Sequence, residues 1–302
     1  MSIMNNRKGR TFIMQNKKVD VPSGKDALRW GVSLLEPLGN DSQTAWLEAN
    51  LLLGKAWNKS RIKLLTTLDD YLETASWESY KNYIMCRVAQ EPLQYLIGEQ
   101  IFMSLCFKVN PDVLIPRGET ELLVNEALKL GLDIKQPKVL DLCTGSGAIA
   151  VSLAYYLPDS EVFAVDISAK ALEIARINAQ ANGVDNKIEF FCGDMFLALE
   201  TKQFDIITCN PPYISATEYV ELPVDVKKEP RLALYGGKDG LQFYRILGAG
   251  ARDFLTEQGI LLMEIGYKQG EEVKRIMEEN GFGNIQIIRD WNGHDRIVTC
   301  TA

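Results

Sequence analysis

Between residues 25 and 91, hydrophobic positions recur every three or four residues, which is the spacing of an amphipathic helix. They form three stripes: Leu28, Val32 and Leu35; Ala45, Ala49, Leu52 and Leu53; and Trp77, Tyr80, Ile84 and Val88. Polar or Pro/Gly breaks at 37–41 and 59–61 separate the stripes. We therefore expect a small helical domain over residues 25–91, with the aromatic stripe in its core.

The pattern changes between residues 92 and 116. Apolar residues recur at short intervals from Phe102 to Ile115, and Gly98 and Pro111 interrupt the segment. Short apolar runs bounded by turn residues are typical of strands. We expect a β-hairpin linker over residues 92–116, between the helical domain and a second domain.

From residue 117 onward, apolar runs that favour strands alternate with helical patterns. The expected strands cover 138–143, 161–166, 188–192, 204–209, 259–265, 285–288 and 296–300. One helix is expected over 148–157, and Ser168 is a candidate N-cap for the helix that carries Leu172, Ala175 and Ala179. Alternation of this kind predicts an α/β domain over 117–302 with a mostly parallel, doubly wound sheet.

Composition places the chain among ordinary globular proteins, with 302 residues, 46% hydrophobic and 24% charged. No apolar run approaches the roughly 18–20 residues of a membrane span. Residues 1–24 are polar and basic without a long apolar core, so we expect a disordered extension and not a secretory signal.

Charge and cysteine content restrict the function further. A net charge of −7 and a pI near 5.0 disfavour strong binding to nucleic acid, which usually requires a basic surface. The six cysteines show no C-x-x-C spacing, and His294 is the only histidine. We therefore expect a reducing, cytoplasmic location, no metal site and no Ser-His-Asp triad.

The segment from Asp141 to Ala150 is predicted to run from a strand through a glycine turn into a helix. Gly145 and Gly147 permit a tight turn and a close backbone approach, because they carry no Cβ. About twenty residues later, Asp166 ends the next strand, where its carboxylate can accept hydrogen bonds from ribose hydroxyls. The pattern predicts a nucleoside site, but it also fits the dinucleotide fingerprint G-x-G-x-x-A.

Two further carboxylates favour S-adenosylmethionine over a dinucleotide. Asp141 precedes the loop and can hold either the ammonium group of the cofactor or the loop itself, whereas a pyrophosphate gains nothing from its charge. Asp194 follows the third strand and can accept from an adenine amino group, and Met195 or Phe196 can cover the ring. A turn or N-cap aspartate is the structural alternative for Asp194.

The four residues Asn210-Pro211-Pro212-Tyr213 follow the fourth strand, at the sheet edge where ligands bind in such folds. The prolines stiffen the turn, so the Asn210 side chain and the Pro211 carbonyl are held at a fixed spacing. Both oxygens can accept from one NH₂ group, and Tyr213 can stack on its plane. Two in-plane acceptors favour the charge that develops as a planar nitrogen attacks a methyl group, so the motif predicts N-methylation.

With these motifs the chain resembles the protein-(glutamine-N5) methyltransferases that modify class 1 peptide-chain release factors. The segments that carry the resemblance are Glu91–Gly98, Leu114–Glu121, the glycine loop, Asn210–Tyr213 and Gly240–Arg245. The resemblance implies a Rossmann-like, seven-stranded S-adenosylmethionine-dependent methyltransferase domain with a small N-terminal helical domain that recognises the substrate. It also implies that the acceptor is the glutamine of a Gly-Gly-Gln loop in the release factor.

Site residues follow from the motifs and the resemblance together. The expected cofactor-binding residues are Asp141, Cys143, Thr144, Gly145, Ser146, Gly147, Asp166, Asp194, Met195 and Asn210. Asn210, Pro211, Pro212 and Tyr213 are expected to bind the substrate, and Asn210, Pro211 and Tyr213 to act in catalysis.

The chain departs from the family pattern at two positions. Gly118 replaces a proline after Arg117, which loosens that turn. Cys143 replaces the first loop glycine and is small enough if its φ is negative. The segment from Arg117 to Glu121 also suits a helix start, since Glu119 and Glu121 would lie near the positive end of the helix dipole.

Other functions fit less of the chain. A methyltransferase acting on the N6 of adenine, or on another nucleobase amino group in DNA or RNA, would use the same four-residue motif and would flip the base into the pocket. It would also need a basic binding element, which this acidic chain does not show. An NAD-dependent oxidoreductase explains the glycines and Asp166 but not Asn210–Tyr213, and an inactive cofactor-binding module explains the motif no better.

Overall fold

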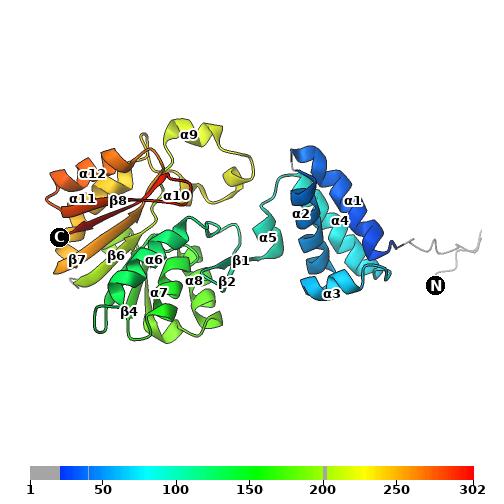
Figure 1. Ribbon diagram of the computed structural model, residues 1–302, viewed down its shortest axis with the longest axis horizontal. Coiled ribbons are helices and arrows are strands. Elements are labelled where there is room, and N and C mark those ends of the chain that lie inside the picture. Colours follow the sequence, from blue (N-terminus) through cyan, green and yellow to red (C-terminus); the bar gives the residue numbers. More distant parts are fainter. Residues whose placement is uncertain (1–20, 40, 200–202) are drawn as a thin grey trace, which may run out of the picture. The chain divides into compact units, whose positions relative to one another are not determined.

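The computed structural model describes residues 21–39, 41–199 and 203–302, and the chain divides into two compact units after Ala89. Figure 1 shows both units with their elements labelled. Each unit is described by itself below.

The first unit consists of helices, as the apolar stripes predict. Its elements are α1 (Gly24–Leu35), η1 (Glu36–Leu38), α2 (Ser42–Ala56), α3 (Arg61–Thr66) and α4 (Thr74–Val88). Helices α1, α2 and α4 pack on one another around the buried side chains of Leu35, Leu52 and Tyr80. An ion pair between Arg87 of α4 and Glu48 of α2, 2.9 Å long and largely buried, joins two of these helices.

A disordered extension was expected over residues 1–24. Residues 1–20 of it lie outside the described residues, whereas residues 21–24 are described. Within the described range, the Ser23 hydroxyl accepts a hydrogen bond from the backbone N–H of Asp26 and caps α1, which begins at Gly24. Pro22 and Ser23 also bond to the Tyr71–Leu72 segment. Residues 21–24, which were expected to belong to the extension, are therefore part of the described first unit.

The second unit is built on one seven-stranded sheet. Its strands are β3 (Lys138–Leu142), β4 (Glu161–Asp166), β5 (Ile188–Cys192), β6 (Phe204–Cys209), β7 (Leu255–Glu264), β8 (Gly283–Arg289) and β9 (Asp295–Thr301). Their order is β5-β4-β3-β6-β7-β9-β8, and only β9 runs antiparallel to its neighbours. The predicted fold class, a Rossmann-like α/β sheet of the methyltransferase type, is confirmed.

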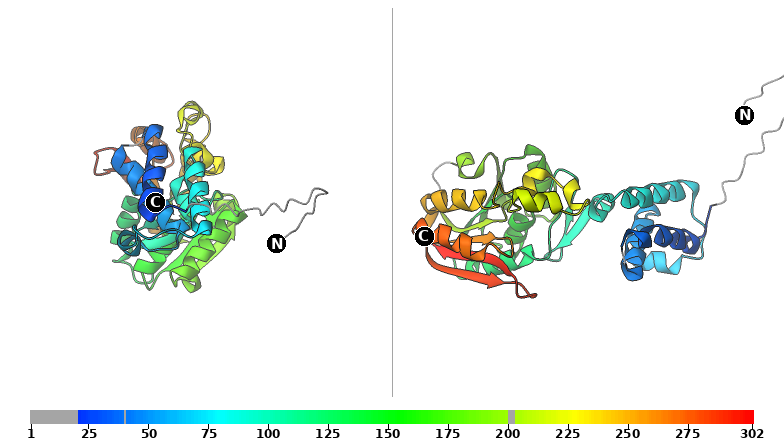
Figure 2. Two further views of the ribbon diagram at one scale, coloured as in Figure 1. Left: turned by 90° about the vertical axis from the view of Figure 1, so that its right-hand side faces the viewer. Right: turned by 90° about the horizontal axis from the view of Figure 1, so that it is seen from above.

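Helices cover both faces of this sheet, as Figures 1 and 2 show. On one face, α6 (Thr120–Gly131), α7 (Ala148–Tyr156) and α8 (Ala169–Ala181) share an apolar core with the strands. On the other, α11 (Gln242–Phe254) and α12 (Gly270–Glu279) pack on a second core. The remaining short elements are η2 (Asp185–Lys187), η3 (Met195–Ala198), α9 (Ala216–Glu221), η4 (Val226–Lys228) and α10 (Arg231–Leu234).

The segment expected as a linker contains a short helix as well as a hairpin. Helix α5 (Leu93–Ile97) precedes the strands β1 (Glu99–Phe102) and β2 (Leu105–Lys108), which pair antiparallel. Five residues of α5 give too short a pattern to separate from a strand in the sequence. Phe102 and Phe107 of the hairpin are buried in the core beneath α6, α7 and α8, so the hairpin is part of the second unit.

Asn178 of α8 anchors the hairpin to the rest of this unit. Its Oδ1 accepts from the Lys108 N–H at 2.7 Å, and its Nδ2 donates to the carbonyl oxygens of Lys108 at 3.0 Å and Ser146 at 2.8 Å. The side chain is fully buried. One carboxamide therefore ties β2, α8 and the glycine loop together.

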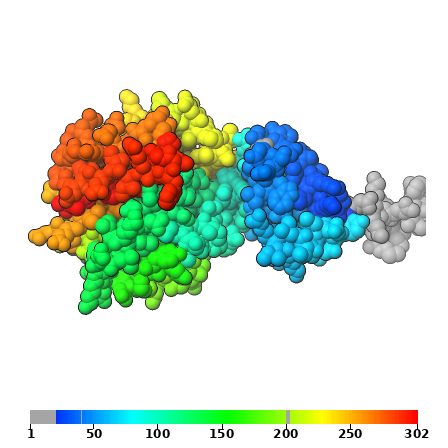
Figure 3. Space-filling model, viewed as in Figure 1, coloured from blue at the N-terminus to red at the C-terminus, as the bar shows by residue number. Residues whose placement is uncertain are grey.

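The segment that follows β6, residues 214–234, lies at the surface of the second unit and is coloured yellow in the space-filling view of Figure 3. It exposes the apolar side chains of Val220, Val224 and Leu232. Within the described ranges, no helix combines the length and the apolar character that crossing a membrane requires.

We predict that Asn178→Ala lowers the free energy of unfolding of the second unit by about 2–4 kcal/mol, because buried polar groups lose their partners. Urea denaturation monitors the change. The matched control is Asn182→Ala at the C-cap of α8, a less buried position, whose side chain donates to the carbonyls of Cys106 and Asn178. Equal losses in the two variants would contradict the anchoring role of Asn178.

Candidate active site

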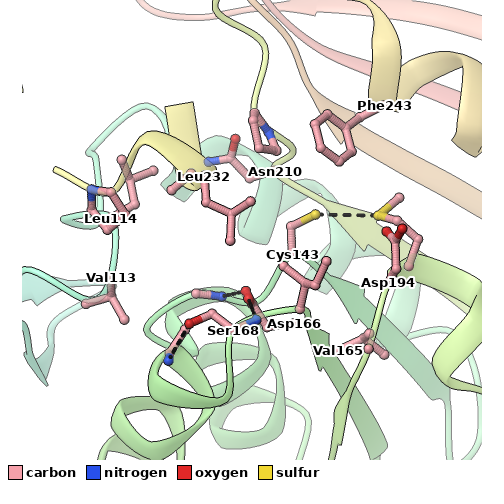
Figure 4. Close-up of a pocket in the computed structure, with 18 of the residues that line it drawn as sticks. Val113, Leu114, Cys143, Val165, Asp166, Ser168, Asp194, Asn210, Leu232 and Phe243 are labelled. Carbon is pink, nitrogen blue, oxygen red and sulfur yellow. Dashed lines mark hydrogen bonds between the residues drawn. The ribbon is translucent and has the colours of Figure 1, made fainter. Parts of the chain in front are cut away.

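A cavity of about 300 Å³ opens at the carboxyl ends of β3, β4 and β6. These strands are parallel neighbours, with Leu142 paired to Val165 on one side and to Cys209 on the other. The loops that follow them therefore meet at one edge of the sheet. Figure 4 shows the cavity and labels ten of the residues that line it.

Six of the predicted cofactor-binding residues line this cavity: Cys143, Gly145, Asp166, Asp194, Met195 and Asn210. The other four, which do not line it, are Asp141, Thr144, Ser146 and Gly147. Of the predicted substrate-binding residues, Asn210 and Pro212 line the cavity, whereas Pro211 and Tyr213 do not.

The glycine loop has the tight turn that its sequence predicts. Gly145 and Gly147 adopt φ values of 56° and 80°, in the left-handed region that glycine tolerates. A Cβ on Gly147 would lie 3.1 Å from the Cβ of Ala175 in α8, so the absent side chain also allows close packing. The Thr144 N–H donates to the Val165 carbonyl at 3.0 Å and fixes the loop on β4.

Asp141 holds the loop from below. Its carboxylate is fully buried and accepts from the hydroxyls of Thr144 at 2.7 Å and Thr208 at 2.8 Å. Burial raises its pKa to about 7, and the two hydroxyl bonds oppose the shift. Of the two roles that the sequence left open, the contacts favour support of the loop over contact with an ammonium group.

Asp166 ends β4 and reaches the cavity. Its Oδ2 accepts from the Gly145 N–H at 2.8 Å and its Oδ1 from the Ser168 N–H at 2.9 Å. Burial raises its pKa, and these two backbone donors oppose the shift. Each carboxylate oxygen can accept more than one hydrogen bond, so the same side chain can still bind ribose hydroxyls.

The condition under which Cys143 replaces a glycine without strain, a negative φ, is not met, because its φ is 59°. A residue with a Cβ costs roughly 1–2 kcal/mol in this region, so the neighbouring hydrogen bonds must hold it there. The Cys143 thiol lines the cavity and donates to the sulfur of Met195 at 3.5 Å, as the dashed line in Figure 4 marks. The two sulfur atoms form part of the cavity wall.

Asp194 occupies the N-cap position of η3, but its side chain makes no capping hydrogen bond to that helix. Asp194 and Met195 both line the cavity, and their contact with an adenine stays a prediction. Phe196 does not line it and stacks on Phe254, with ring centroids 4.9 Å apart. Met195 is therefore the candidate to cover the base.

The Asn210–Tyr213 turn is held by two other segments. A Cβ on Gly236 would lie 2.6 Å from the Pro212 carbonyl oxygen, so only glycine allows this approach. Gln269 donates from Nε2 to the Tyr213 carbonyl at 3.0 Å. Tyr213 packs against the core that contains α11 and α12, and its pKa rises above its ordinary range because of burial. Tyr213 therefore packs on this core and does not line the cavity, and its stacking on a substrate amide stays a prediction.

The segment from Arg117 to Glu121 joins three parts of the second unit. Arg117 forms an ion pair with the buried Glu229, which also accepts from the Ile115 N–H at 3.0 Å. Glu121 accepts from the Met103 N–H at the hairpin tip, 2.7 Å away. Helix α6 begins at Thr120, so the segment is a helix start as well as a junction. Gly118 is exposed, and a Cβ at this position would meet no atom within 4 Å. The glycine that stands here in place of the family's proline therefore leaves the contacts of this junction intact.

Sequence reasoning missed most of the apolar wall. The additional lining residues include Val113, Leu114, Leu232, Phe243 and Ile246. Leu114 and Phe243 lie within segments that carry the family resemblance, which is the signal that points to them. Leu232 carries no such signal in the sequence. Across the described ranges, no group of three or more His, Cys, Asp or Glu side chains is placed to hold a metal ion.

Comparison with family models agrees with this architecture. Residues 118–224 match the Methyltransferase small domain, and residues 26–98 match the PrmC N-terminal domain. The fold and the first match define an S-adenosylmethionine-dependent methyltransferase, for which S-adenosylmethionine is the methyl donor.

A curated relative defines the family. The chain is 44% identical to a release factor glutamine methyltransferase from Moorella thermoacetica over 251 residues, which cover 83% of this chain and 89% of the relative. The chain therefore belongs to the release factor glutamine methyltransferase family. It is also 37% identical to a bifunctional methyltransferase from Rickettsia felis, of which it spans about half, 53%.

A solved structure supports the fold alone. The catalytic domain of hMettl16 in complex with the MAT2A 3′UTR hairpin 6 has a TM-score of 0.53 at 14% identity, and the match covers 73% of this chain and 82% of that one. The family assignment disfavours the nucleobase and oxidoreductase alternatives.

Because burial raises the Asp141 pKa from 3.8 to about 7, the folded state binds more protons than the unfolded state in that window. Its contribution to the free energy of unfolding therefore falls as pH rises from about 4 to about 7. We predict that wild type loses roughly 2 kcal/mol more than Asp141→Asn between pH 5 and pH 8, measured by urea denaturation. Asp159→Asn, at an exposed site, controls for lost charge, and parallel curves for wild type and Asp141→Asn would contradict this account.

Proposed function

We propose that this protein transfers a methyl group from S-adenosylmethionine to the side-chain amide nitrogen, N5, of the glutamine in the Gly-Gly-Gln loop of class 1 peptide-chain release factors. The observation that carries the proposal is the position of Asn210. Its carboxamide lines the same cavity as Asp166 and Asp194, at the start of a turn that two prolines stiffen.

The cavity suits this cofactor in charge. Asp166 and Asp194 contribute carboxylates to its lining, which contains no Lys, Arg or His among the described residues. S-adenosylmethionine carries a positive sulfonium and supplies a methyl group with a good leaving group, whereas a dinucleotide carries a negative pyrophosphate. An acidic lining therefore favours the former. Asp166 would hold the ribose, Asp194 the adenine amino group, and Met195 the face of the base.

The protein supplies alignment of the acceptor. The Asn210 side-chain oxygen and the Pro211 carbonyl would accept the two N–H groups of the glutamine amide and hold its nitrogen in line with the methyl group. Alignment of this kind lowers the barrier by up to about 7–11 kcal/mol where the geometry is ideal. Two oxygen acceptors also favour the positive charge that develops on the nitrogen. As the new C–N bond forms, the bond between the methyl carbon and the cofactor sulfur would break, and the nitrogen would then release a proton to solvent. We assign no general base to this step among the described residues.

The cellular location and the recognition of the protein substrate follow from the proposed reaction. Release factors work with the ribosome, so we infer a cytoplasmic location. The helical unit over residues 25–91 is the proposed recognition domain for the protein substrate. With a net charge of −7, the chain is not expected to bind nucleic acid strongly.

Labelled S-adenosylmethionine tests the reaction with three acceptors: a release factor, a Gly-Gly-Gln peptide and a DNA oligomer. We expect label on the release factor, and Asn210→Ala should reduce turnover about 100-fold or more because the acceptor loses its alignment. The thermal midpoint of the variant checks its folding. Label on DNA alone would contradict the proposed substrate, and turnover of Asn210→Ala within threefold of wild type would contradict the role of Asn210.

Asp166→Ala should weaken cofactor binding by about 1.5–3 kcal/mol, the value of hydrogen bonds to a charged group. Isothermal calorimetry with the demethylated cofactor measures the change. Asp112 provides a comparison, since its carboxylate lines the cavity but forms an ion pair with Lys170 at 3.2 Å. A dissociation constant unaffected by Asp166→Ala, or affected no more than by Asp112→Ala, would remove Asp166 from the ribose site.

A further inference from the structure

Two hydrogen bonds link Asn210 to a buried carboxylate outside the cavity. Asn210 Nδ2 lies 3.2 Å from the Thr120 hydroxyl, and that hydroxyl lies 2.6 Å from Oε2 of Glu264. Thr120 is the first residue of α6, Glu264 ends β7, and Asn210 follows β6. Thr120 is 90 residues from Asn210 and 144 residues from Glu264 in the chain, and the fold brings the three side chains into contact.

The chemistry of the middle group sets the direction of both bonds. A threonine hydroxyl has one proton to donate and lone pairs to accept with. A carboxylate can only accept, so the hydroxyl proton must point to Glu264 when Glu264 is ionised. The hydroxyl must then accept from Asn210, which requires the NH₂ end of the carboxamide. The oxygen Oδ1 is consequently the end left for the substrate.

This direction matters because the two ends of a carboxamide are nearly equal in size and opposite in function. With Oδ1 towards the substrate, Asn210 accepts from a glutamine NH₂ group. With the amide turned over, two NH₂ groups would face each other and neither could accept. The stiff backbone around Pro211 and Pro212 does not decide between these states, since rotation about the last side-chain bond exchanges them.

We propose that Thr120 and Glu264 are positioning residues that set the Asn210 carboxamide with its oxygen towards the glutamine substrate. The proposal rests on the proposed function and adds the groups that select one of two orientations. Thr120 is 4% exposed and Glu264 is 2% exposed, so water does not compete for either bond. An unmade hydrogen bond at either group would leave a buried polar atom, which makes the chain of bonds rigid.

Protonation of Glu264 would release the constraint. Burial raises its pKa to about 7, and Glu119 adds to the rise, while Thr120, Tyr213 and Arg296 oppose it. Arg296 is itself paired with Asp290, and the Tyr244 hydroxyl donates to the Glu264 backbone carbonyl. A protonated Glu264 can donate to the Thr120 hydroxyl oxygen. The Thr120 hydroxyl can then donate its own proton to Oδ1 of a flipped Asn210 carboxamide. Turnover should therefore rise with pH through about 7 and follow the ionised fraction of Glu264.

The first test compares Thr120→Val, Thr120→Ser and Glu264→Gln with wild type in release-factor methylation. Thr120→Val keeps the shape but loses the hydroxyl, so we expect kcat to fall at least tenfold while KM for the release factor and the cofactor dissociation constant change less than threefold. Thr120→Ser should restore kcat to within threefold. Glu264→Gln should remove the rise of kcat near pH 7. Ser160→Ala, which removes another buried hydroxyl, bonded only to the Leu157 carbonyl, should behave as wild type.

The second test reads the orientation without turnover. In ¹⁵N-labelled protein, the side-chain NH₂ of Asn210 should exchange slowly with solvent in wild type and in Thr120→Ser, and at least tenfold faster in Thr120→Val. Equal exchange in all three, or a Thr120→Val enzyme with wild-type kcat and pH profile, would overturn the proposal. Absence of methyl transfer by wild type with intact slow exchange would instead overturn the proposed function and leave the orientation established.

Discussion

Buried carboxyl groups joined to threonine hydroxyls hold the reactive edge of this sheet together. Asp141 at the centre accepts from Thr144 in the glycine loop and from Thr208 on the adjacent strand, so one side chain fixes the loop against two strands. Glu264 repeats the arrangement on β7 with Thr120 of α6. Both groups lie out of contact with water, where an unmade bond is costly, and this cost makes the loop positions definite.

The Asn210–Tyr213 turn shows the same dependence on its surroundings. Its prolines limit the backbone, but Gly236, Gln269 and Thr120 decide where the turn and its Asn210 side chain lie. These residues belong to three separate segments: Gly236 follows α10, Gln269 precedes α12, and Thr120 is the first residue of α6. Activity in this fold therefore depends on the packing of the loops against one another as much as on the four-residue motif itself.

The sequence predicted the sheet well because each strand is an apolar run bounded by turn residues, and it predicted the cavity edge because Gly145, Asp166 and Asn210 follow such runs. It did not predict which side chains face the cavity. Asp141 and Tyr213 carry the right chemistry but are directed to neighbours far away in the sequence. Helix α5 was missed because its five residues hold too short a pattern, and Leu232 because nothing local distinguishes a cavity wall from an exposed loop.

The left-handed backbone at Cys143 has a consequence for how such sites are recognised. Where glycine stands at this position, the residue itself tolerates the turn, whereas here a residue that disfavours the conformation adopts it under the constraint of the bonds around it. The turn is thus specified by its context and can survive the loss of its defining glycine. A motif that demands glycine at this position would pass over this loop, although its turn is present and the buried Asp141 carboxylate holds it from beneath.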